Sequence, residues 1–274
     1  MSSAWQHLLE WLDPVAFSIG FLSVHWYGIC FLLGIAAVWF WLERERKRRW
    51  GIQSALVDEF FFVILVGALI GARLGYAFWY APEYFWEYPL ALISPFDPVS
   101  GSYIGFSGLS FHGALAGLTL ACFVWAVRRR QDFLIWTDQL ALAVPLGIFF
   151  GRIGNFMNGE LWGRPTDMAW GIYFPLADSL LRHPSPLYEA LGEGALLWML
   201  LVFLRRFVGS QPGWMTVWFL GLYGWIRFIL EYFREPDIQV GWLWLGFSLG
   251  QWLSLGLIGV SGVLFWLLKR KHRV

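Results

Sequence analysis

The 274-residue chain is 58% hydrophobic and only 14% charged, with a formal net charge of +1. Such an apolar composition is typical of a polytopic membrane protein and excludes an ordinary soluble domain. The near-zero net charge argues against a nucleic-acid partner, because no excess of cations is present to displace counterions from phosphates. The two cysteines, Cys30 and Cys122, lie in apolar runs and provide neither a disulfide framework nor a CxxC metal site.

Apolar runs long enough to cross a bilayer recur along the chain and predict an all-α, polytopic bundle of about seven spans. The predicted spans are residues 20–42, 58–80, 108–127, 134–151, 187–204, 214–233 and 245–268. The first run lacks a basic N-terminal region and is read as a retained anchor rather than a cleavable signal peptide. The proline- and aromatic-rich stretch 81–107 is expected to be an external loop with short interfacial pieces. We expect one domain over residues 1–274.

Basic residues follow the first, third, fifth and seventh spans and decide the orientation. They are Arg44, Arg46, Lys47, Arg48, Arg49, Arg128, Arg129, Arg130, Arg205, Arg206, Lys269, Arg270, Lys271 and Arg273. This asymmetry predicts an external N-terminus and a cytoplasmic C-terminus. The outer side then holds Arg152, Glu160, Arg164, Arg182, His183 and Arg234.

Small residues recur at every fourth position in several spans, which lets helix backbones approach closely in lipid. The glycines concerned are Gly67, Gly71, Gly75, Gly113, Gly117, Gly147 and Gly151. We interpret this spacing as helix packing rather than chemistry.

The segment GRIGNFMNGELWG, residues 151–163, is the first candidate for a functional site. It places Arg152, Asn155, Asn158 and Glu160 at the end of a long apolar run. A charged side chain in the bilayer is costly, about 3 kcal/mol on insertion scales, and is kept where it pairs or faces a polar cavity. The segment is therefore predicted to line a functional site.

A second polar group lies in the sixth span, where Tyr223, Arg227, Glu231 and Arg234 are spaced by four, four and three. This spacing predicts a common helix face. A purely structural alternative is an intrahelical Arg227–Glu231 pair. This alternative does not explain why Tyr223 and Arg234 are also predicted on the same helix face.

The remaining polar groups are two histidines near the starts of predicted spans and the segment that leads into the fifth span. His112, early in the third span, is a candidate general base, or alternatively a histidine that hydrogen-bonds between helices. His25 and Tyr27 lie early in the first span, where an aromatic interfacial anchor is the alternative to a site role. In the segment 182–189, Ser185 is expected to cap the fifth span.

The sequence carries no acidic cluster of metal-ligand spacing and no GxSxG context, so metal and serine-hydrolase chemistry are not predicted. The charged residues in or near the predicted spans are instead mainly arginines, namely Arg152 and Arg227 together with Arg73 and Arg234. Arginine pairs bidentately with phosphate and stays charged when desolvated. An anionic phospholipid headgroup is the ligand that this set suits.

These residues give the chain a resemblance to the bacterial prolipoprotein diacylglyceryl transferases. The family's signature is carried by GRIGNFMNGELWGRP, and further blocks follow the family's order along nearly the whole chain. These blocks are HWYG at 25–28, GARLGY at 71–76, SFHGAL at 110–115, RHPSPLYE at 182–189, YGWIRFILEYFREPD at 223–237 and GQWLS at 250–254. Pro186 departs from the family pattern, which commonly has glutamine there.

The resemblance implies transfer of a diacylglyceryl group from phosphatidylglycerol to the lipobox cysteine of a prolipoprotein signal peptide, with no cofactor. It also implies a seven-helix bundle in the bacterial inner membrane, an active site toward the outer face, and a small external head region at about 152–187. The implied catalytic residues are His112, Arg152, Arg227 and Tyr27. The implied substrate-binding residues are Asn155, Asn158, Glu160, Gly163, Arg73, Tyr223, Glu231, Arg234 and His25.

Three alternatives remain open from the residues. A transporter would explain intramembrane Arg, His and Glu, but it is expected to show repeat symmetry and polar groups throughout the bilayer depth. A headgroup phosphotransferase usually needs a metal-binding acidic cluster. A lipoprotein chaperone would use the arginines for binding alone, and loss of turnover with retained binding would distinguish it.

Overall fold

The computed structural model describes residues 3–20, 22–50, 53–102, 108–208, 211–236 and 243–271. Residues 103–107 of the predicted loop, Asp237 of a family block and Arg273 of the tail lie outside these ranges. Within the described part, six helical segments are long and apolar enough to cross a membrane, and a shorter apolar helix is the seventh. They are Trp26–Arg48, Ser54–Trp79, Phe111–Arg129, Phe133–Met157, Ser185–Val208, Leu249–Lys271 and the shorter Trp214–Leu230. The predicted all-α polytopic fold is confirmed.

The chain divides into two compact units, Met1–Leu42 with Thr137–Val274, and Glu43–Trp136. The first contains α1 (Ser3–Gln6), α2 (Leu8–Trp11), β1 (Val15–Ile19), β2 (Leu22–His25), most of α3 (Trp26–Glu45), most of α7 (Phe133–Met157), β3 (Ile172–Tyr173), β4 (Leu181–Arg182), α8 (Ser185–Glu189), η3 (Ala190–Leu196), α9 (Leu197–Val208), α10 (Trp214–Leu230), η4 (Trp244–Gly246) and α11 (Leu249–Lys271). The second contains η1 (Arg46–Trp50), α4 (Ser54–Trp79), α5 (Pro82–Glu87), η2 (Pro89–Leu92) and α6 (Phe111–Arg129).

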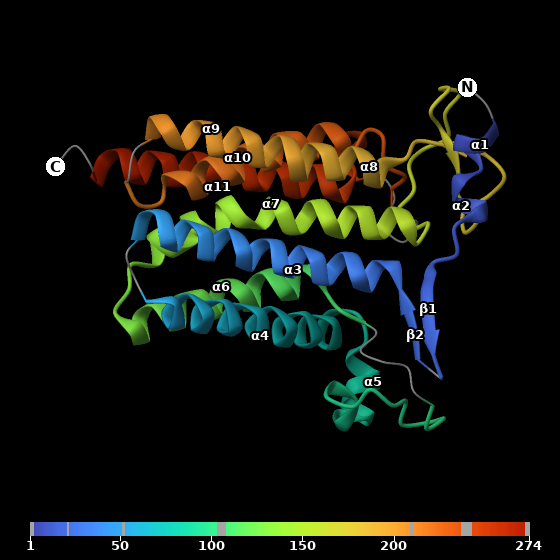
Figure 1. Cartoon of the computed structure of the whole chain (residues 1–274), viewed down its shortest axis with the longest axis horizontal. Coiled ribbons are helices and arrows are strands. Elements are labelled where there is room, and N and C mark those ends of the chain that lie inside the picture. The colour runs from blue at the N-terminus through green and yellow to red at the C-terminus, as the bar shows by residue number, and fades with distance from the viewer. Residues whose placement is uncertain are drawn as a thin grey trace. The chain divides into compact units, whose positions relative to one another are not determined.

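In the first unit, helices α7, α9, α10 and α11 run alongside one another, and α1, α2 and α8 gather at one end of them (Figure 1). A small apolar core forms at that end from Leu9, Phe156, Ile172 and Phe174. It joins the N-terminal helix α2 to the end of α7 and to the two-stranded sheet β3–β4. The last turn of α11 lies at the opposite end of this unit (Figure 1).

The first span begins later than predicted, because β1 (Val15–Ile19) and β2 (Leu22–His25) pair as antiparallel strands in which Val15 faces His25. The tight turn contains Gly20 with a positive φ of 61°, a conformation that glycine adopts without steric cost. Alternating Val15, Phe17 and Ile19 favour strands over helix. The expected span start at residue 20 is therefore wrong, and His25 lies in a strand rather than in the membrane helix.

The fourth, fifth and sixth spans also differ from their predicted lengths. The fourth and fifth are longer, covering Phe133–Met157 and Ser185–Val208, the latter through the π-helical turn η3. The sixth is shorter: α10 ends at Leu230, so Arg234 lies beyond the helix and forms a β-bridge with Gly163. The prediction that Arg234 shares a face of this helix is therefore wrong.

The second unit is built on the close packing of α4 against α6. A Cβ added at Gly71 would collide with the carbonyl oxygen of Gly113 and lie 2.7 Å from Cα of Gly117. Gly67 and Gly75 meet the same helix in the same way. The predicted role of these glycines in packing is confirmed. It is wrong for Gly151, where an added Cβ would have nothing within 4 Å.

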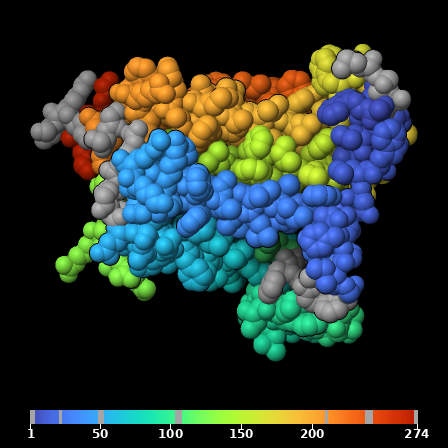
Figure 2. Space-filling model, viewed as in Figure 1, coloured from blue at the N-terminus to red at the C-terminus, as the bar shows by residue number. Residues whose placement is uncertain are grey.

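Residues 82–102, which follow α4, fold into a small knob at one end of that helix, drawn in green in Figure 1 and Figure 2. Phe85 and Ala91 pack on Ala77 of α4 as its core. Trp86, Leu90 and Ile93 are 91%, 74% and 75% exposed. Short helices with exposed aromatic and aliphatic side chains match the interfacial pieces expected from the sequence.

Candidate active site

The most unusual feature of the first unit is a buried cluster of three arginines and three glutamates. Helix α7 supplies Arg152, α8 and η3 supply Glu189 and Glu193, and α10 with its following turn supplies Arg227, Glu231 and Arg234. Three segments that are distant in sequence, α7, α8–η3 and the end of α10, therefore meet at one charged centre.

Arg227 is the central cation of this cluster. Its Nη1 lies 2.9 Å from Oε1 of Glu189 and 3.0 Å from Oε1 of Glu193, and its Nη2 lies 2.6 Å from Oε2 of Glu231. The intrahelical Arg227–Glu231 pair considered from the sequence does form. It is one edge of a larger network, because the same guanidinium also binds both carboxylates of the neighbouring segment.

Glu189 is the central anion, because all three arginines reach it. Arg152 Nε lies 2.9 Å from its Oε2, and Arg234 Nη1 lies 3.3 Å from its Oε1. The side chains of Glu189 and Glu193 are 1% and 0% exposed. Carboxylates this deeply buried stay ionised only when they are paired, so arginines and glutamates hold each other in place.

The second oxygens of the three glutamates keep some hydrogen-bonding capacity. Arginine nitrogens lie within ion-pair distance of Oε2 of Glu189, Glu193 and Glu231. None of these oxygens, however, receives an aligned hydrogen bond from any residue that the structure describes. The cluster therefore offers acceptor positions beside the guanidinium donors.

Ser248, just before the block GQWLS at 250–254, binds the Glu231 oxygen that Arg227 does not contact. Ser248 donates from Oγ to Oε1 of Glu231 at 2.9 Å, and its backbone N–H donates to the fully buried Gln251. A Cβ at Gly250 would lie 2.6 Å from the Glu231 carboxyl carbon. The glycine thus leaves room for the carboxylate, which explains this block in terms of the cluster.

The end of α7 and the turn after it carry the other predicted polar residues. Asn158 donates to Glu160 at 2.7 Å, and the Asn155 carbonyl accepts from the Glu160 N–H. Tyr27 lies within electrostatic range of both Glu160 and Arg152. Tyr223 is within the same range of Arg152 and Arg227. Tyr27 and Tyr223 therefore lie near arginines of the cluster, whereas Asn155, Asn158 and Glu160 bind one another at the end of α7.

Gly163 lies where three chain segments cross. Its N–H donates to the His183 carbonyl, and the adjacent Arg164 N–H donates to the Phe233 carbonyl. A Cβ at Gly163 would lie 2.5 Å from both of these carbonyl oxygens. Only glycine permits so close a crossing, which gives this residue a structural reason for its place in the signature.

The start of α8 does not follow the predicted capping pattern. Ser185 is the first helical residue, and its hydroxyl donates to the carbonyl of Leu161 at 2.7 Å. The expectation that Ser185 caps the helix is therefore wrong, because the hydroxyl ties α8 to the turn after α7. Pro186, the residue that departs from the family pattern, is buried beside it.

Arg182 binds two carboxylates, one earlier and one later in the chain. It donates to both oxygens of Asp178, at 3.0 and 2.6 Å, to Glu235 at 3.1 Å and to the Gly163 carbonyl at 2.8 Å. The hydrogen bonds from Arg182 lower the pKa of the Asp178 carboxyl. Nearby, burial lowers the pKa of His183, whose Nδ1 lies 3.1 Å from the Tyr188 hydroxyl.

We expect the Asp178–Arg182 pair to make the stability of the folded protein decrease as the pH falls into the acid range. A carboxyl whose pKa is lower in the folded state stabilises the fold above its unfolded pKa of about 3.9, and this stability is lost as pH falls through the folded pKa. The difference in Tm between the wild type and Asp178→Asn should be constant at pH 5–7 and shrink below about pH 4. A difference that is unchanged from pH 6 to pH 3 would contradict this.

Two predicted residues, Arg73 and His112, belong to the second unit. Arg73 donates to the carbonyls of Ala91 at 2.5 Å and Leu92 at 3.1 Å, and its guanidinium lies 5.0 Å from the Phe85 ring centroid. It therefore joins the end of α4 to the exposed knob. His112 is exposed in the first turn of α6 and lines an apolar hollow of about 550 Å³ with Leu115, Thr119 and Phe123 among others.

Sequence reasoning missed Glu189 and Glu193 as site residues. Both lie in an apolar run and are four residues apart, which places them on one helix face. Acidic residues inside a membrane span are themselves a functional signal, so the information was present. Although acidic groups meet here, no group of three or more His, Cys, Asp or Glu among the described residues could hold a metal ion.

Comparison with known proteins gives a consistent result. The family model described as prolipoprotein diacylglyceryl transferase matches residues 14–267. Proteins named phosphatidylglycerol–prolipoprotein diacylglyceryl transferase are similar over nearly their whole length. One from Idiomarina loihiensis is 40% identical over 95% of this chain and 94% of its own, and one from Campylobacter curvus is 39% identical over 99% of both. One from Pseudoalteromonas translucida is 42% identical over 94% of both. With its membrane bundle, its signature segment and full-length similarity in agreement, the chain belongs to the prolipoprotein diacylglyceryl transferase family.

Proposed function

We infer that this chain transfers the diacylglyceryl group of phosphatidylglycerol to prolipoproteins, the first step of lipoprotein maturation. Its relatives carry this activity in their names, and the chain matches them over almost its full length. The multi-pass helical fold suits a reaction whose lipid substrate stays in the bilayer.

The buried arginine–glutamate cluster is the observation that carries our assignment of the site. A glycerol phosphate headgroup has an anionic phosphate, which accepts hydrogen bonds, and hydroxyls, which donate them. Arg152 and Arg227 supply donors for the phosphate, and the second oxygens of Glu189 and Glu193 supply acceptors for hydroxyls. Because three arginines balance three glutamates, the headgroup is recognised through directed hydrogen bonds rather than through net charge.

The proposed reaction forms a thioether. The sulfur of a lipobox cysteine attacks the glycerol carbon that bears the phosphate, a C–S bond forms, the C–O bond breaks, and its electron pair leaves with glycerol phosphate. The thiol proton must be removed, because the thiolate is the nucleophile. His112 is our candidate base. Arg152 and Arg227 stabilise the charge that develops on the leaving phosphate.

The remaining predicted residues are assigned to positioning of the substrate. Asn155, Asn158 and Glu160 would orient the headgroup or the turn after α7, and Tyr27 and Tyr223 would line the site. Gly163, Arg234, Glu231, Arg73 and His25 stay as predicted substrate-binding residues. We place the protein in the bacterial inner membrane with the site toward the outer face, and treat residues 1–274 as one catalytic domain with a head at about 152–187.

The test is transfer by purified protein in liposomes that contain phosphatidylglycerol and a lipobox peptide, followed by mass spectrometry of the peptide. The wild type should add a diacylglyceryl mass, and Arg152→Ala should slow this by about 10²–10³-fold. Arg206→Ala, which changes an exposed arginine of α9, is the matched control and should retain the wild-type rate.

Each result of this assay bears on a different part of the proposal. Full activity of Arg152→Ala would keep the reaction but remove Arg152 from the site. No transfer by folded wild-type protein, in several lipid compositions, would overturn the function. Binding of peptide by His112→Gln without turnover would agree with a base at that position, whereas normal turnover would exclude it.

A further inference from the structure

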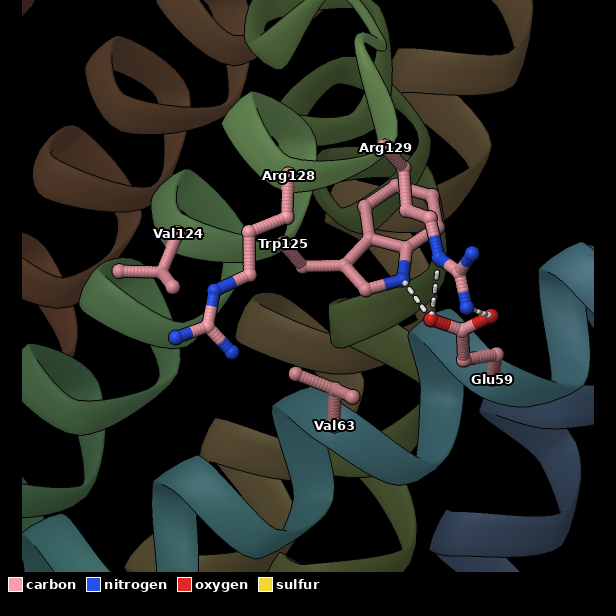
Figure 3. A pocket seen from close by; sticks show the side chains of 6 residues that line it. All are labelled: Glu59, Val63, Val124, Trp125, Arg128 and Arg129. Atoms are coloured by element: carbon pink, nitrogen blue, oxygen red, sulfur yellow. Dashed lines mark hydrogen bonds and ion pairs between the residues drawn. The ribbon is translucent and has the colours of Figure 1, made fainter.

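A pocket of about 270 Å³ lies in the second unit, between the first turns of α4 and the last turns of α6. Its walls are formed by Glu59, Val63, Val124, Trp125, Arg128 and Arg129. Figure 3 shows Glu59, Arg129 and the Trp125 indole on one side of it, the Arg128 guanidinium on the other, and Val63 between them. No residue of this pocket takes part in the chemistry proposed above.

The charge of Glu59 is already matched inside the pocket. Arg129 binds it bidentately, with Nε 2.7 Å from Oε1 and Nη2 2.6 Å from Oε2, and the Trp125 indole N–H donates to Oε1 at 3.1 Å. Both carboxylate oxygens therefore have strong donors. Arg129 therefore neutralises the charge of this carboxylate within the pocket.

Arg128 is the unmatched charge. Among the residues that the structure describes, it has no ion-pair or hydrogen-bond partner, and Figure 3 shows its side chain extending away from Glu59. One free guanidinium beside a neutralised pair makes the pocket net positive. Val63 and Val124 make the wall next to this guanidinium apolar. A ligand that suits both must combine an anion with a hydrocarbon part.

We propose that this pocket binds the phosphate of an anionic membrane phospholipid, with Arg128 on the phosphate and the start of an acyl chain against Val63 and Val124. Arginine forms bidentate hydrogen bonds with phosphate, and basic pockets between membrane helices on the cytoplasmic side bind anionic headgroups.

This site is separate from the reaction site. Arg128 and His112 stand sixteen residues apart on the same helix, about 24 Å at 1.5 Å per residue. The surrounding sequence is basic. Arg130 directly follows the two pocket arginines, and Arg46 and Lys47, which pair with Glu43, belong to the same unit. The bound lipid would therefore hold the α4–α6 pair at the headgroup level rather than take part in transfer.

The experiment counts bound lipids by native mass spectrometry on the purified full-length protein. The probe is phosphatidylserine, an anionic lipid that is not the proposed donor, and the comparison lipid is phosphatidylcholine. We expect the wild type to retain one more phosphatidylserine than phosphatidylcholine, and Arg128→Gln to bind this additional molecule about tenfold more weakly. In detergent without added lipid its Tm should equal that of the wild type, because Arg128 has no protein partner to lose, and its transfer rate should be unchanged because the pocket is separate from the reaction site.

Arg130→Gln is the matched control. It removes the same charge two positions further along the chain, and Arg130 does not line the pocket. It should bind phosphatidylserine like the wild type. Equal weakening by both variants would mean a general charge effect and would overturn the site. Equal retention of phosphatidylcholine, or complete displacement by millimolar inorganic phosphate, would also overturn it, the latter by identifying a free-anion site.

Discussion

Replacing Arg227 by glutamine is expected to destabilise the protein by about 3–5 kcal/mol, because it breaks a buried ion pair and leaves its partners uncompensated. Three carboxylates lose a cation at once, and two of them are 1% or less exposed. Transfer should fall as well, by about 10²-fold or more, if Arg227 binds the phosphate. Thermal unfolding in detergent and the liposome transfer assay measure the two effects separately.

A second substitution distinguishes stability from chemistry. Adding Glu193→Gln to Arg227→Gln removes one charge of each sign and should restore part of the lost stability. Transfer should not recover, since the phosphate donor is still missing. Arg234→Gln is the milder comparison, because Arg234 lies farther from Glu189, at 3.3 Å, than Arg152 and Arg227, each at 2.9 Å. A stable Arg227→Gln protein with normal transfer would contradict the central role of this arginine.

Replacing Gly71 by alanine is expected to separate α4 from α6. The new methyl group would meet the backbone of the partner helix at Gly113 and Gly117, where no side chain can move aside. Overpacking of this kind costs typically 1–3 kcal/mol, and we expect about 3 kcal/mol or more because backbone atoms are involved. The measurement is the thermal midpoint, together with the yield of folded protein.

Gly259→Ala in α11 is the matched control. It changes a glycine in another membrane helix, but its added Cβ would have nothing within 4 Å. Alanine is a better helix former than glycine, so this variant should gain about 0.5–1 kcal/mol or stay unchanged. If Gly71→Ala were as stable as Gly259→Ala, the close α4–α6 contact would not describe the folded protein.

The bundle could be predicted because its signal is local and strong. A run of about twenty apolar residues has few soluble alternatives, so each of the seven predicted spans corresponds to a helix, six of them long enough to cross a membrane and α10 shorter. Their ends were less accurate. The hairpin before α3 was missed because strands of four or five residues, Leu22–His25 and Val15–Ile19, are too short to be distinguished from the adjoining apolar run.

The end of α10 was missed for a different reason. Glu231, Tyr232 and Phe233 continue the apolar and charged pattern of the helix, yet the chain turns there. Arg234 leaves the helix to pair with Gly163 and to reach Glu189. Contacts with residues about forty to seventy positions away decided this boundary, and helix propensity carries no information about them.

Composition and spacing alone determined that this is a polytopic helical protein with intramembrane arginines, because apolar runs and charges in them are read locally. The four-residue spacing of Arg227 and Glu231 was also enough to predict the ion pair between them. Only the tertiary structure showed that Glu189 and Glu193 meet Arg152, Arg227 and Arg234. The physical reason is that a buried charge must be compensated by whichever group the folded chain brings within a few ångströms, and that group need not be near it in the sequence.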